Sequence, residues 1–502
     1  MAIIFLVLVL LISLWFILTK KTYTKTRQKL PPGPRSLPII GNLHQLGNLP
    51  HRNLQKLAQK HGHIMSIKLG TVPTIVVSSP QAAELFLKNH DTNFASRPKI
   101  QASEYLSYGT KGLVFAEYGP YWRNTRKLCT LQLLSSSKAE SFAELRKEEL
   151  GLALESLKKS AAKGELVDLS RKIGEVVEDI STRMILGRRK DDDLYDLKGI
   201  AEEALKLAGA FNLADCVPWL GQFDLQGLAK RMKKASKLID QVLEKIITEH
   251  QKDTNNQHRD FVDILLPLMN QPMNNPQDKH VYTIDRTNIK AILLDLMVAS
   301  FDAATTITDW TMSELLRNPR VMKKLQEELR RVIGMDRKVE EKDLGKLNYL
   351  DMVVKESFRL HPVVPLLVPR ECMEDISVGG YDIPKKARLM VNTWAIGRDP
   401  NVWSNNVEEF YPERFIDRNI DLKGHDFELL AFGSGRRMCP GMHLGLITVR
   451  LVLAQLVHCF DWELPDGMQP NDIGMDEIFG LSLPRANHLL VKPIYRLVGN
   501  DI

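Results

Sequence analysis

The stretch that decides the fold reads Phe432-Gly433-Ser434-Gly435-Arg436-Arg437-Met438-Cys439-Pro440-Gly441. A cysteine among glycines and beside arginines has its thiolate form favoured by positive charge and by backbone N–H groups. The glycines allow the loop to approach a flat macrocycle closely, and Arg437 can pair with a carboxylate on it. These features favour Cys439 as a thiolate ligand of haem iron. A buried structural cysteine in a glycine-rich turn is the alternative.

The stretch also resembles a known family signature. It matches the haem-binding loop of the cytochrome P450 superfamily, Phe-x-x-Gly-x-Arg-x-Cys-x-Gly, at every fixed position. Two further motifs occur in the order that this family has: Lys355-Glu356-Ser357-Phe358-Arg359 resembles its Glu-x-x-Arg pair, and Tyr411-Pro412-Glu413-Arg414-Phe415 resembles its Pro-Glu-Arg-Phe segment. The resemblance implies a structural ionic cluster of Glu356, Arg359 and Arg414. Taken singly, Glu356 and Arg359 could be an ordinary solvated pair one helical turn apart.

The resemblance also implies a set of cofactor contacts. Trp122-Arg123-Asn124-Thr125-Arg126-Lys127 is similar to the family's Trp-Arg-x-x-Arg helix. Trp122 and Arg126 would then hydrogen-bond a haem propionate, and the exposed basic residues of this helix would help to dock an acidic reductase. The cofactor is expected to be haem b, with Cys439 on the iron and the remaining haem contacts made by Arg370, Phe432 and Arg437.

The resemblance spans essentially the whole chain. It implies a mostly α fold with a small β portion, and NADPH- and reductase-dependent monooxygenation of a small hydrophobic molecule with O2. Pro31-Pro32-Gly33-Pro34 and Phe94-Ala95-Ser96-Arg97-Pro98 look most like plant enzymes of specialised metabolism. Terpenoids and phenolic compounds are the expected substrate classes.

One segment departs from the family pattern. The oxygen-activating helix usually reads Ala/Gly-Gly-x-Asp/Glu-Thr-Thr/Ser, and the matching residues here are Ala299-Ser300-Phe301-Asp302-Ala303-Ala304. Asp302 is retained, whereas Ala303 replaces the threonine that would hold a catalytic water. The hypothesis is that protons arrive through Asp302 and ordered water, aided by Thr306 or by a substrate hydroxyl. Alternatively, Asp302 merely caps a polar water pocket.

This departure keeps two other functions open. With Ala303, the enzyme could be an isomerase or dehydratase that acts on an already oxidised substrate and needs no reductase. It could also be an inactive, membrane-tethered haem-binding scaffold. Against the first alternative, the glutamate–arginine cluster, the basic helix and the unmodified haem loop resemble those of members that use oxygen.

Apolar residues at the positions where this family binds substrate predict a hydrophobic pocket. Phe301 should narrow that pocket over the haem. Individually each residue could be plain core. The predicted substrate residues are Tyr105, Leu113, Val298, Phe301, Val363, Val364, Leu367 and Leu481.

The N-terminus predicts a membrane anchor. Ala2 to Leu18 is a run of 17 residues without a charge, at the lower limit of a bilayer-spanning helix and too long for a signal-peptide core. Lysines and arginines follow at once, which favours a cytosolic body. We therefore predict an anchor at 1–19, a basic and proline-rich linker at 20–38, and a haem-binding catalytic domain at 39–502. The expected location is the endoplasmic reticulum membrane, crossed once.

Charge and cysteine usage exclude other classes. The net charge is +7, but residues 1–83 carry ten of the 68 Lys and Arg and no Asp or Glu, so the excess lies beside the predicted anchor. A nucleic-acid-binding protein needs a basic folded face with stacking aromatics, and no such pattern is present. The five cysteines lack CxxC pairs, which argues against a disulfide framework and a zinc site.

The periodicity of apolar residues predicts the main elements. Alternation between Ile64 and Val77 predicts a β-hairpin that turns near Gly70. From about residue 81 a helical period predominates. The longest helix should begin near Asp285 and end at Asn318-Pro319, and its middle is apolar enough to be buried.

Overall fold

The computed structural model describes residues 29–188, 197–252, 260–273, 282–404 and 406–498. Within these ranges helices predominate and the strands are short, so the expected mostly α fold with a small β portion is confirmed. The predicted anchor at 1–19 and the first part of the linker lie outside the described residues.

The helices follow one another along the whole described chain, with strands concentrated near residues 64–77, 370–391 and 460–495. The α-helices are α2 Pro50–His61, α3 Pro80–Glu84, α4 Gln101–Leu106, α5 Pro120–Leu128, α6 Ser136–Ser141, α7 Ala143–Ala162, α8 Leu169–Leu186, α9 Leu197–Gly209, α10 Leu213–Cys216, α11 Leu228–Lys252, α12 Phe261–Leu265, α13 Arg286–Arg317, α14 Pro319–Ile333, α15 Asn348–Leu360, α16 Thr393–Ile396, α17 Pro400–Trp403 and α18 Met442–Cys459.

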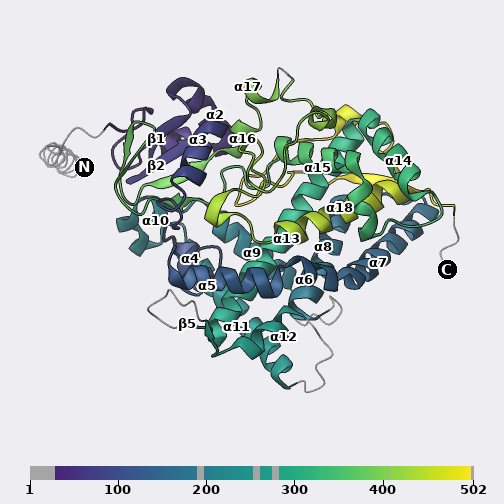
Figure 1. The fold of residues 1–502 in the computed structure, drawn as a ribbon, viewed down its shortest axis with the longest axis horizontal. Coiled ribbons are helices and arrows are strands. Elements are labelled where there is room, and N and C mark those ends of the chain that lie inside the picture. The colour runs from purple at the N-terminus through teal and green to yellow at the C-terminus, as the bar shows by residue number, and fades with distance from the viewer. Residues whose placement is uncertain (1–28, 189–196, 253–259, 274–281, 405, 499–502) are drawn as a thin grey trace, which may run out of the picture.

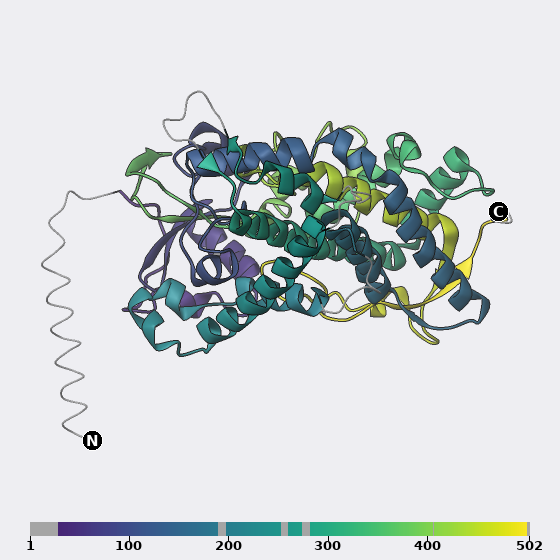
Figure 2. The same ribbon diagram turned by 90° about the horizontal axis from the view of Figure 1, so that it is seen from below.

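Among the described residues, the strands form small sheets of two to four strands. They are β1 Ile64–Leu69, β2 Val72–Val77, β3 Val167–Asp168, β4 Pro272–Met273, β5 Tyr282–Thr283, β6 Arg370–Glu371, β7 Ile376–Val378, β8 Tyr381–Ile383, β9 Arg388–Val391, β10 Phe460–Glu463 and β11 Leu490–Tyr495. The purple strands β1 and β2 lie at one end of the long axis and the yellow C-terminal strands toward the other, in both views (Figure 1, Figure 2).

The predicted hairpin is confirmed. Strands β1 and β2 are antiparallel, with Ile64 opposite Val77 and the turn at Gly70. Gly70 has a φ of +62°, and a Cβ there would lie 2.2 Å from the carbonyl oxygen of Cys216, so the turn requires glycine. β2 then pairs in parallel with β9, and β9 pairs with β6, giving the order β1-β2-β9-β6. Helices also predominate after residue 81, as predicted, and the strands β3 to β11 among them are short.

The longest helix has the predicted bounds. α13 begins after Asp285, whose carboxylate accepts the backbone N–H of Asn288, and it ends before Asn318-Pro319, where the proline lacks the N–H that would continue it. Its middle is buried as expected, with Ala291, Ile292 and Leu293 inaccessible to solvent. It packs against α8, α18 and α15, and their apolar side chains form the largest core cluster.

Among the described residues, α13 and α18 are long and apolar enough to cross a bilayer. More than half of each apolar window is buried inside the protein. The apolar composition of these two helices is therefore explained by their place in the protein core.

Candidate active site

The loop that carries Cys439 is held in a closed turn immediately before α18. The N–H of Cys439 donates to the carbonyl oxygen of Phe432 at 2.9 Å, and the Phe432 ring lies 5.3 Å from that of Phe358. Gly435 has a φ of +68°, and a Cβ there would come within 2.4 Å of the Leu87 carbonyl oxygen. The glycines are thus required by backbone conformation and close approach.

Cys439 differs from the other four cysteines, which are buried: its side chain is partly accessible. Burial in the protein raises the pKa of the Cys439 thiol, while the backbone N–H of Gly441 and the charge of Arg126 lower it. Because only the thiolate ligates metal, a bound iron would displace the remaining proton. Cys439 therefore has the access, and two of the stabilising groups, that a thiolate ligand needs.

Four arginines gather around this loop. Burial, followed by the charges of Arg437, Arg370 and Arg126, lowers the pKa of Arg97 well below its usual value. Burial likewise lowers the pKa of Arg437 to about 9. Asp91 is the acid that faces the group, with its Oδ1 at 2.8 Å from Nη1 of Arg370. The sequence does not predict Arg97 as a cofactor contact, although Arg97 stands in the motif of residues 94–98.

This excess of buried positive charge fits an anionic ligand. Arg437 donates from Nε to the Ala95 carbonyl and from Nη2 to the Ala116 carbonyl, both at 2.6 Å. Its third nitrogen, Nη1, is buried without a hydrogen-bond partner. Since buried polar groups are normally paired, an unpaired guanidinium nitrogen among cations indicates that an acceptor belongs there. The propionates of haem have the required charge, so the residues present fit this cofactor.

Trp122 supports the arginines through its ring. The Arg437 guanidinium lies 4.0 Å and that of Arg126 5.4 Å from the indole, within the range of cation–π attraction. The indole N–H donates to the Leu113 carbonyl at 3.0 Å, and Arg126 donates to the Met438 carbonyl at 2.6 Å. The predicted direct hydrogen bonds of Trp122 and Arg126 to a propionate remain predictions.

The comparisons with known proteins agree with this geometry. The family model described as Cytochrome P450 matches residues 31–491. This chain belongs to the cytochrome P450 family. It is accordingly an oxidoreductase that incorporates oxygen, and its cofactor is haem b.

Named plant relatives of this P450 cover nearly all of its length. Cytochrome P450 CYP736A12 of Panax ginseng is 57% identical, over 96% of this chain and 97% of its own. Desmethyl-deoxy-podophyllotoxin synthase of Sinopodophyllum hexandrum is 41% identical, over 96% and 95%. Flavonoid 3'-monooxygenase of Petunia hybrida is 40% identical, over 93% and 92%.

The structure brings together the three residues of the predicted ionic cluster. Arg359 binds both carboxylate oxygens of Glu356, at 2.7 and 2.9 Å, and Arg414 binds the same carboxylate at 2.9 Å. Glu356 and Arg359 are almost inaccessible to solvent. Arg359 also donates to the carbonyls of Gly397 and Val407. The cluster thereby ties α15 to the chain that leads into the haem loop of the P450.

The middle of α13 carries the residues that depart from the family pattern together with the retained Asp302. Burial raises the pKa of Asp302, the Ser482 side chain lowers it through a hydrogen bond, and the charge of Glu202 raises it further. Ala303 is exposed, whereas Thr306 is buried, with 4% of its surface accessible. Asp302 is therefore a carboxyl that holds its proton more readily than usual.

The predicted substrate residues come from several elements that the structure places close together. Val298 and Phe301 lie in α13 and pack against the same core cluster as Leu113. The backbone N–H of Leu483 donates to the Val363 carbonyl at 2.9 Å, and the Trp310 indole donates to the Leu483 carbonyl at 2.8 Å. The C-terminal loop thus lies between the segment that follows α15 and the helix α13.

The remaining predicted substrate residues are placed less uniformly. Val364 and Leu367 pack against two different core clusters, and Leu367 has a φ of +50°. The backbone of Leu481 contacts the end of α9, where a Cβ on Gly209 would lie 2.3 Å from its nitrogen. Tyr105 packs with residues of α9 and α11 in a separate cluster, under Lys233. A shared substrate pocket for all eight remains a prediction.

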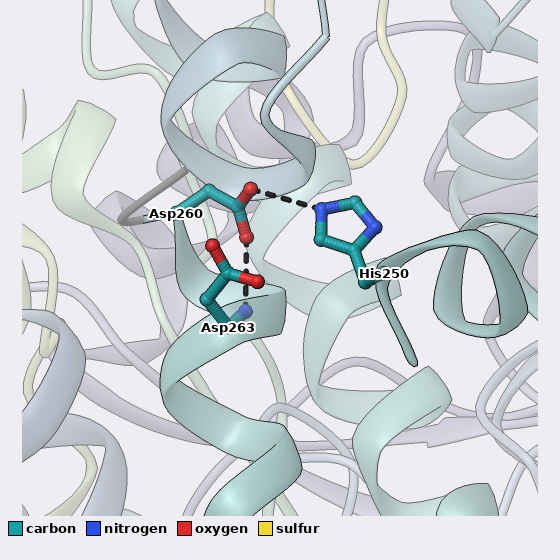
Figure 3. A group of neighbouring side chains, drawn as sticks. All are labelled: His250, Asp260 and Asp263. Atoms are coloured by element: carbon teal, nitrogen blue, oxygen red, sulfur yellow. Dashed lines mark hydrogen bonds and ion pairs between the residues drawn. The ribbon is translucent and has the colours of Figure 1, made fainter. Parts of the chain in front are cut away.

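One cluster with metal-like composition lies apart from this site. His250, Asp260 and Asp263 offer ligand atoms within 4.8 Å of one another (Figure 3). However, Nε2 of His250 faces the Asp260 carboxylate at 2.9 Å and Nδ1 faces the Ile246 carbonyl at 2.8 Å, so both ring nitrogens face acceptors. That arrangement suits a protonated histidine. Asp260 also caps α12 by accepting the N–H of Asp263. The cluster is an ion pair that joins α11 to α12.

Proposed function

We propose that this P450 is a haem-thiolate monooxygenase that oxidises a small hydrophobic plant metabolite with O2 and with electrons from NADPH. The observation that carries the proposal is the partly accessible Cys439 in a glycine-rich loop beside four arginines, one of which has an unpaired buried nitrogen. Haem b supplies the oxygen-activating chemistry when bound. Cys439 ligates its iron, and Arg97, Arg126, Arg370 and Arg437 hold its propionates.

The terpenoid or phenolic class is the proposed substrate range. In support, two plant relatives are named desmethyl-deoxy-podophyllotoxin synthase and flavonoid 3'-monooxygenase. The predicted substrate residues Val298 and Phe301 of α13, and Val363 and Val364 after α15, are apolar, so shape rather than charge would select the substrate. The comparisons give no support to the isomerase or to the inactive-scaffold alternative.

NADPH–cytochrome P450 reductase is the proposed electron donor. Arg123 and Lys127 on α5 are exposed, as is Arg436 in the haem loop. Arg126, between them in sequence, contacts the Met438 carbonyl next to Cys439, so these cations lie on the thiolate side of the loop. Such a basic surface would attract an acidic partner and align it with the shortest route for electrons.

The endoplasmic reticulum membrane is the proposed location, with a single N-terminal span and a cytosolic catalytic domain. An exposed apolar patch supports contact between the body and a bilayer. It consists of Phe211, Trp219, Phe223 and Leu225, which are 53–66% exposed. Groups of exposed large apolar side chains mark sites of protein or membrane contact.

The apolar patch lies at the end of the molecule where the described part of the chain begins. The N–H of Thr71, in the β1–β2 turn, donates to the Cys216 carbonyl of α10 at 2.9 Å, and Gly41 bridges to Leu69 of β1. Helix α10 lies below β1 and β2 in Figure 1. Leu37, Ile39 and Ile40 are also exposed there. A bilayer at this end would cover both segments.

Proton supply is proposed to run through Asp302, with Thr306 one turn further along α13. Ala303 is not part of the buried core, whereas its neighbour Ala304 is buried. We therefore expect Ala303→Thr to fold normally and to couple NADPH consumption to product more efficiently. Measuring NADPH used per product formed checks this, with Ala304→Thr as the control that should instead destabilise the core. Unchanged coupling would count against the route.

The experiment that tests the proposed function is replacement of the ligand. Purified protein should show the long-wavelength Soret band of a reduced carbon-monoxide complex that is typical of a thiolate ligand. Cys439→Ser should abolish this band, whereas Cys459→Ser, a change at a buried cysteine within the core, should keep it. Retention of the band in Cys439→Ser refutes the ligand assignment.

A further inference from the structure

A short strap between α4 and α5 connects the cofactor-holding groups to the predicted substrate residues. It comprises residues 112–116 and forms neither a helix nor a strand. Its carbonyl groups are used by side chains that hold the cofactor: Leu113 accepts from the Trp122 indole, Val114 from Nε of Arg97 at 3.1 Å, and Ala116 from Nη2 of Arg437. Displacement of the strap would therefore move all three donors.

A single carboxylate fixes the N–H side of this strap. Oδ2 of Asp295 accepts the backbone N–H of Leu113 at 2.6 Å and that of Val114 at 2.9 Å. These residues are 182 and 181 positions away in the sequence. Gly112 leaves space for the contact, because a Cβ there would lie 2.2 Å from the same carboxylate oxygen. The strap and Asp295 are complementary in shape as well as in hydrogen bonding.

The presence of an acid at this point of α13 needs an explanation. Asp295 interrupts the otherwise apolar residues 291–298, and nothing in the proposed chemistry uses it. The pKa of Asp295 is raised to about 6, because the effect of burial outweighs the opposite effect of the N–H groups of Val114 and Leu113. Burying a carboxyl is costly unless hydrogen bonds to it compensate. The two amide contacts are the compensation that the structure shows.

We propose that Asp295 is a positioning residue that sets the strap, and through it both the grip on the cofactor and the place of Leu113 in the substrate pocket. It acts through Trp122, Arg97 and Arg437, and it need not touch the reacting atoms. The cofactor half of this inference rests on the proposed function. The contact between Asp295 and the strap does not rest on the proposed function, because the structure shows it within the polypeptide itself.

Hydrogen exchange on the haem-loaded, full-length protein tests the contact directly. In Asp295→Leu, the amides of Leu113 and Val114 should exchange about tenfold faster or more, because hydrogen bonds to a charged acceptor are lost. Asp295→Asn keeps an oxygen acceptor and should restore most of the protection. Gly112→Ala keeps the acid but places a methyl against it, so it should mimic Asp295→Leu even if that variant folds poorly.

A matched control separates positioning from general damage. Asp309 lies on the same helix, is 7% exposed and accepts from the Ser170 hydroxyl at 2.7 Å, without contact to the strap. Asp309→Leu should lower stability but leave exchange of the strap unchanged. Unchanged exchange in both Asp295→Leu and Gly112→Ala overturns the inference.

Two cofactor-level measurements complete the test. Transfer of haem to apomyoglobin should be about tenfold faster in Asp295→Leu and Gly112→Ala than in Asp309→Leu. The dissociation constant of 4-phenylimidazole should change by more than that of imidazole, because binding of a larger probe depends more on the shape of the pocket that Leu113 is predicted to line. Suppose that the amides of the strap exchange faster while haem transfer and the dissociation constants stay the same. That result would overturn the proposed coupling between the strap and the cofactor site. Loss of the thiolate spectrum in the parent protein would instead remove the proposed function while leaving the exchange result intact.

Discussion

At the scale of single residues, Glu356 carries the largest expected energetic effect. It holds two arginines, of which Arg359 is fully enclosed and Arg414 is 6% exposed. Glu356→Gln removes the charge that compensates both. Breaking a buried ion pair in this way costs about 3–5 kcal/mol of unfolding free energy, because the remaining charge is left uncompensated. Denaturant unfolding followed by circular dichroism measures the loss.

An exposed pair provides the control for this prediction. Lys88 and Glu84 also form an ion pair within one helical turn, but their side chains are 63% and 41% exposed. Glu84→Gln should change the unfolding free energy by about 0.5 kcal/mol or less. Equal losses in the two variants would show that burial does not decide the strength of the Glu356 cluster.

Residues of the site differ in how far the sequence reveals them. Cys439, Arg437 and the Glu356–Arg359 pair stand in short motifs, where spacing alone carries the signal. Asp91 and Asp295 have no such motif, because their partners are distant: Asp91 binds Arg370, 279 positions away, and Asp295 binds Leu113. Only the folded chain shows what these acids do. Arg97 is an intermediate case, because it stands in a family motif that does not by itself indicate a cofactor contact.

At the scale of secondary-structure elements, the bounds of α13 were predictable because both of its end signals are local. Asp285 and Asn288 cap each other at the start, and Pro319 ends the helix. Strands β6 and β9 were missed for the opposite reason. They are two and four residues long, and β9 pairs with β2, so that Thr74 lies opposite Arg388. A strand this short has no periodicity of its own.

The junction between α11 and α12 should be sensitive to pH. Burial lowers the pKa of His250, but the hydrogen bond and charge of Asp260 and the Ile246 carbonyl outweigh it, so that the pKa is raised above 6.5. A raised histidine pKa contributes stability that is fully present below pH 6.5 and is lost as the pH rises through the folded-state value. His250→Gln should therefore destabilise the protein more at about pH 6 than at about pH 8.5.

Urea unfolding of the wild type and of His250→Gln at the two pH values measures this difference. His488→Gln is the control, because His488 also pairs with an aspartate, Asp168, but its side chain is 64% exposed. We expect the control to lose little stability at either pH value, because an exposed ion pair contributes little. A difference between wild type and His250→Gln that is constant across the two pH values would contradict the assignment of a charged His250.

At the scale of the whole molecule, the proposed contact of one end of the body with a membrane can be tested without the predicted anchor. A protein that lacks residues 1–28 should still sediment with phospholipid vesicles through the apolar patch. Trp219→Asp with Phe223→Asp should weaken this association at least about tenfold, since each side chain would otherwise bury a large apolar area in lipid. Leu152→Asp is the matched control: Leu152 is 57% exposed, as Trp219 is, but it lies on α7, far from α10 in Figure 1. Equal weakening by the control, or none by the double substitution, would show that this end of the body does not face the bilayer.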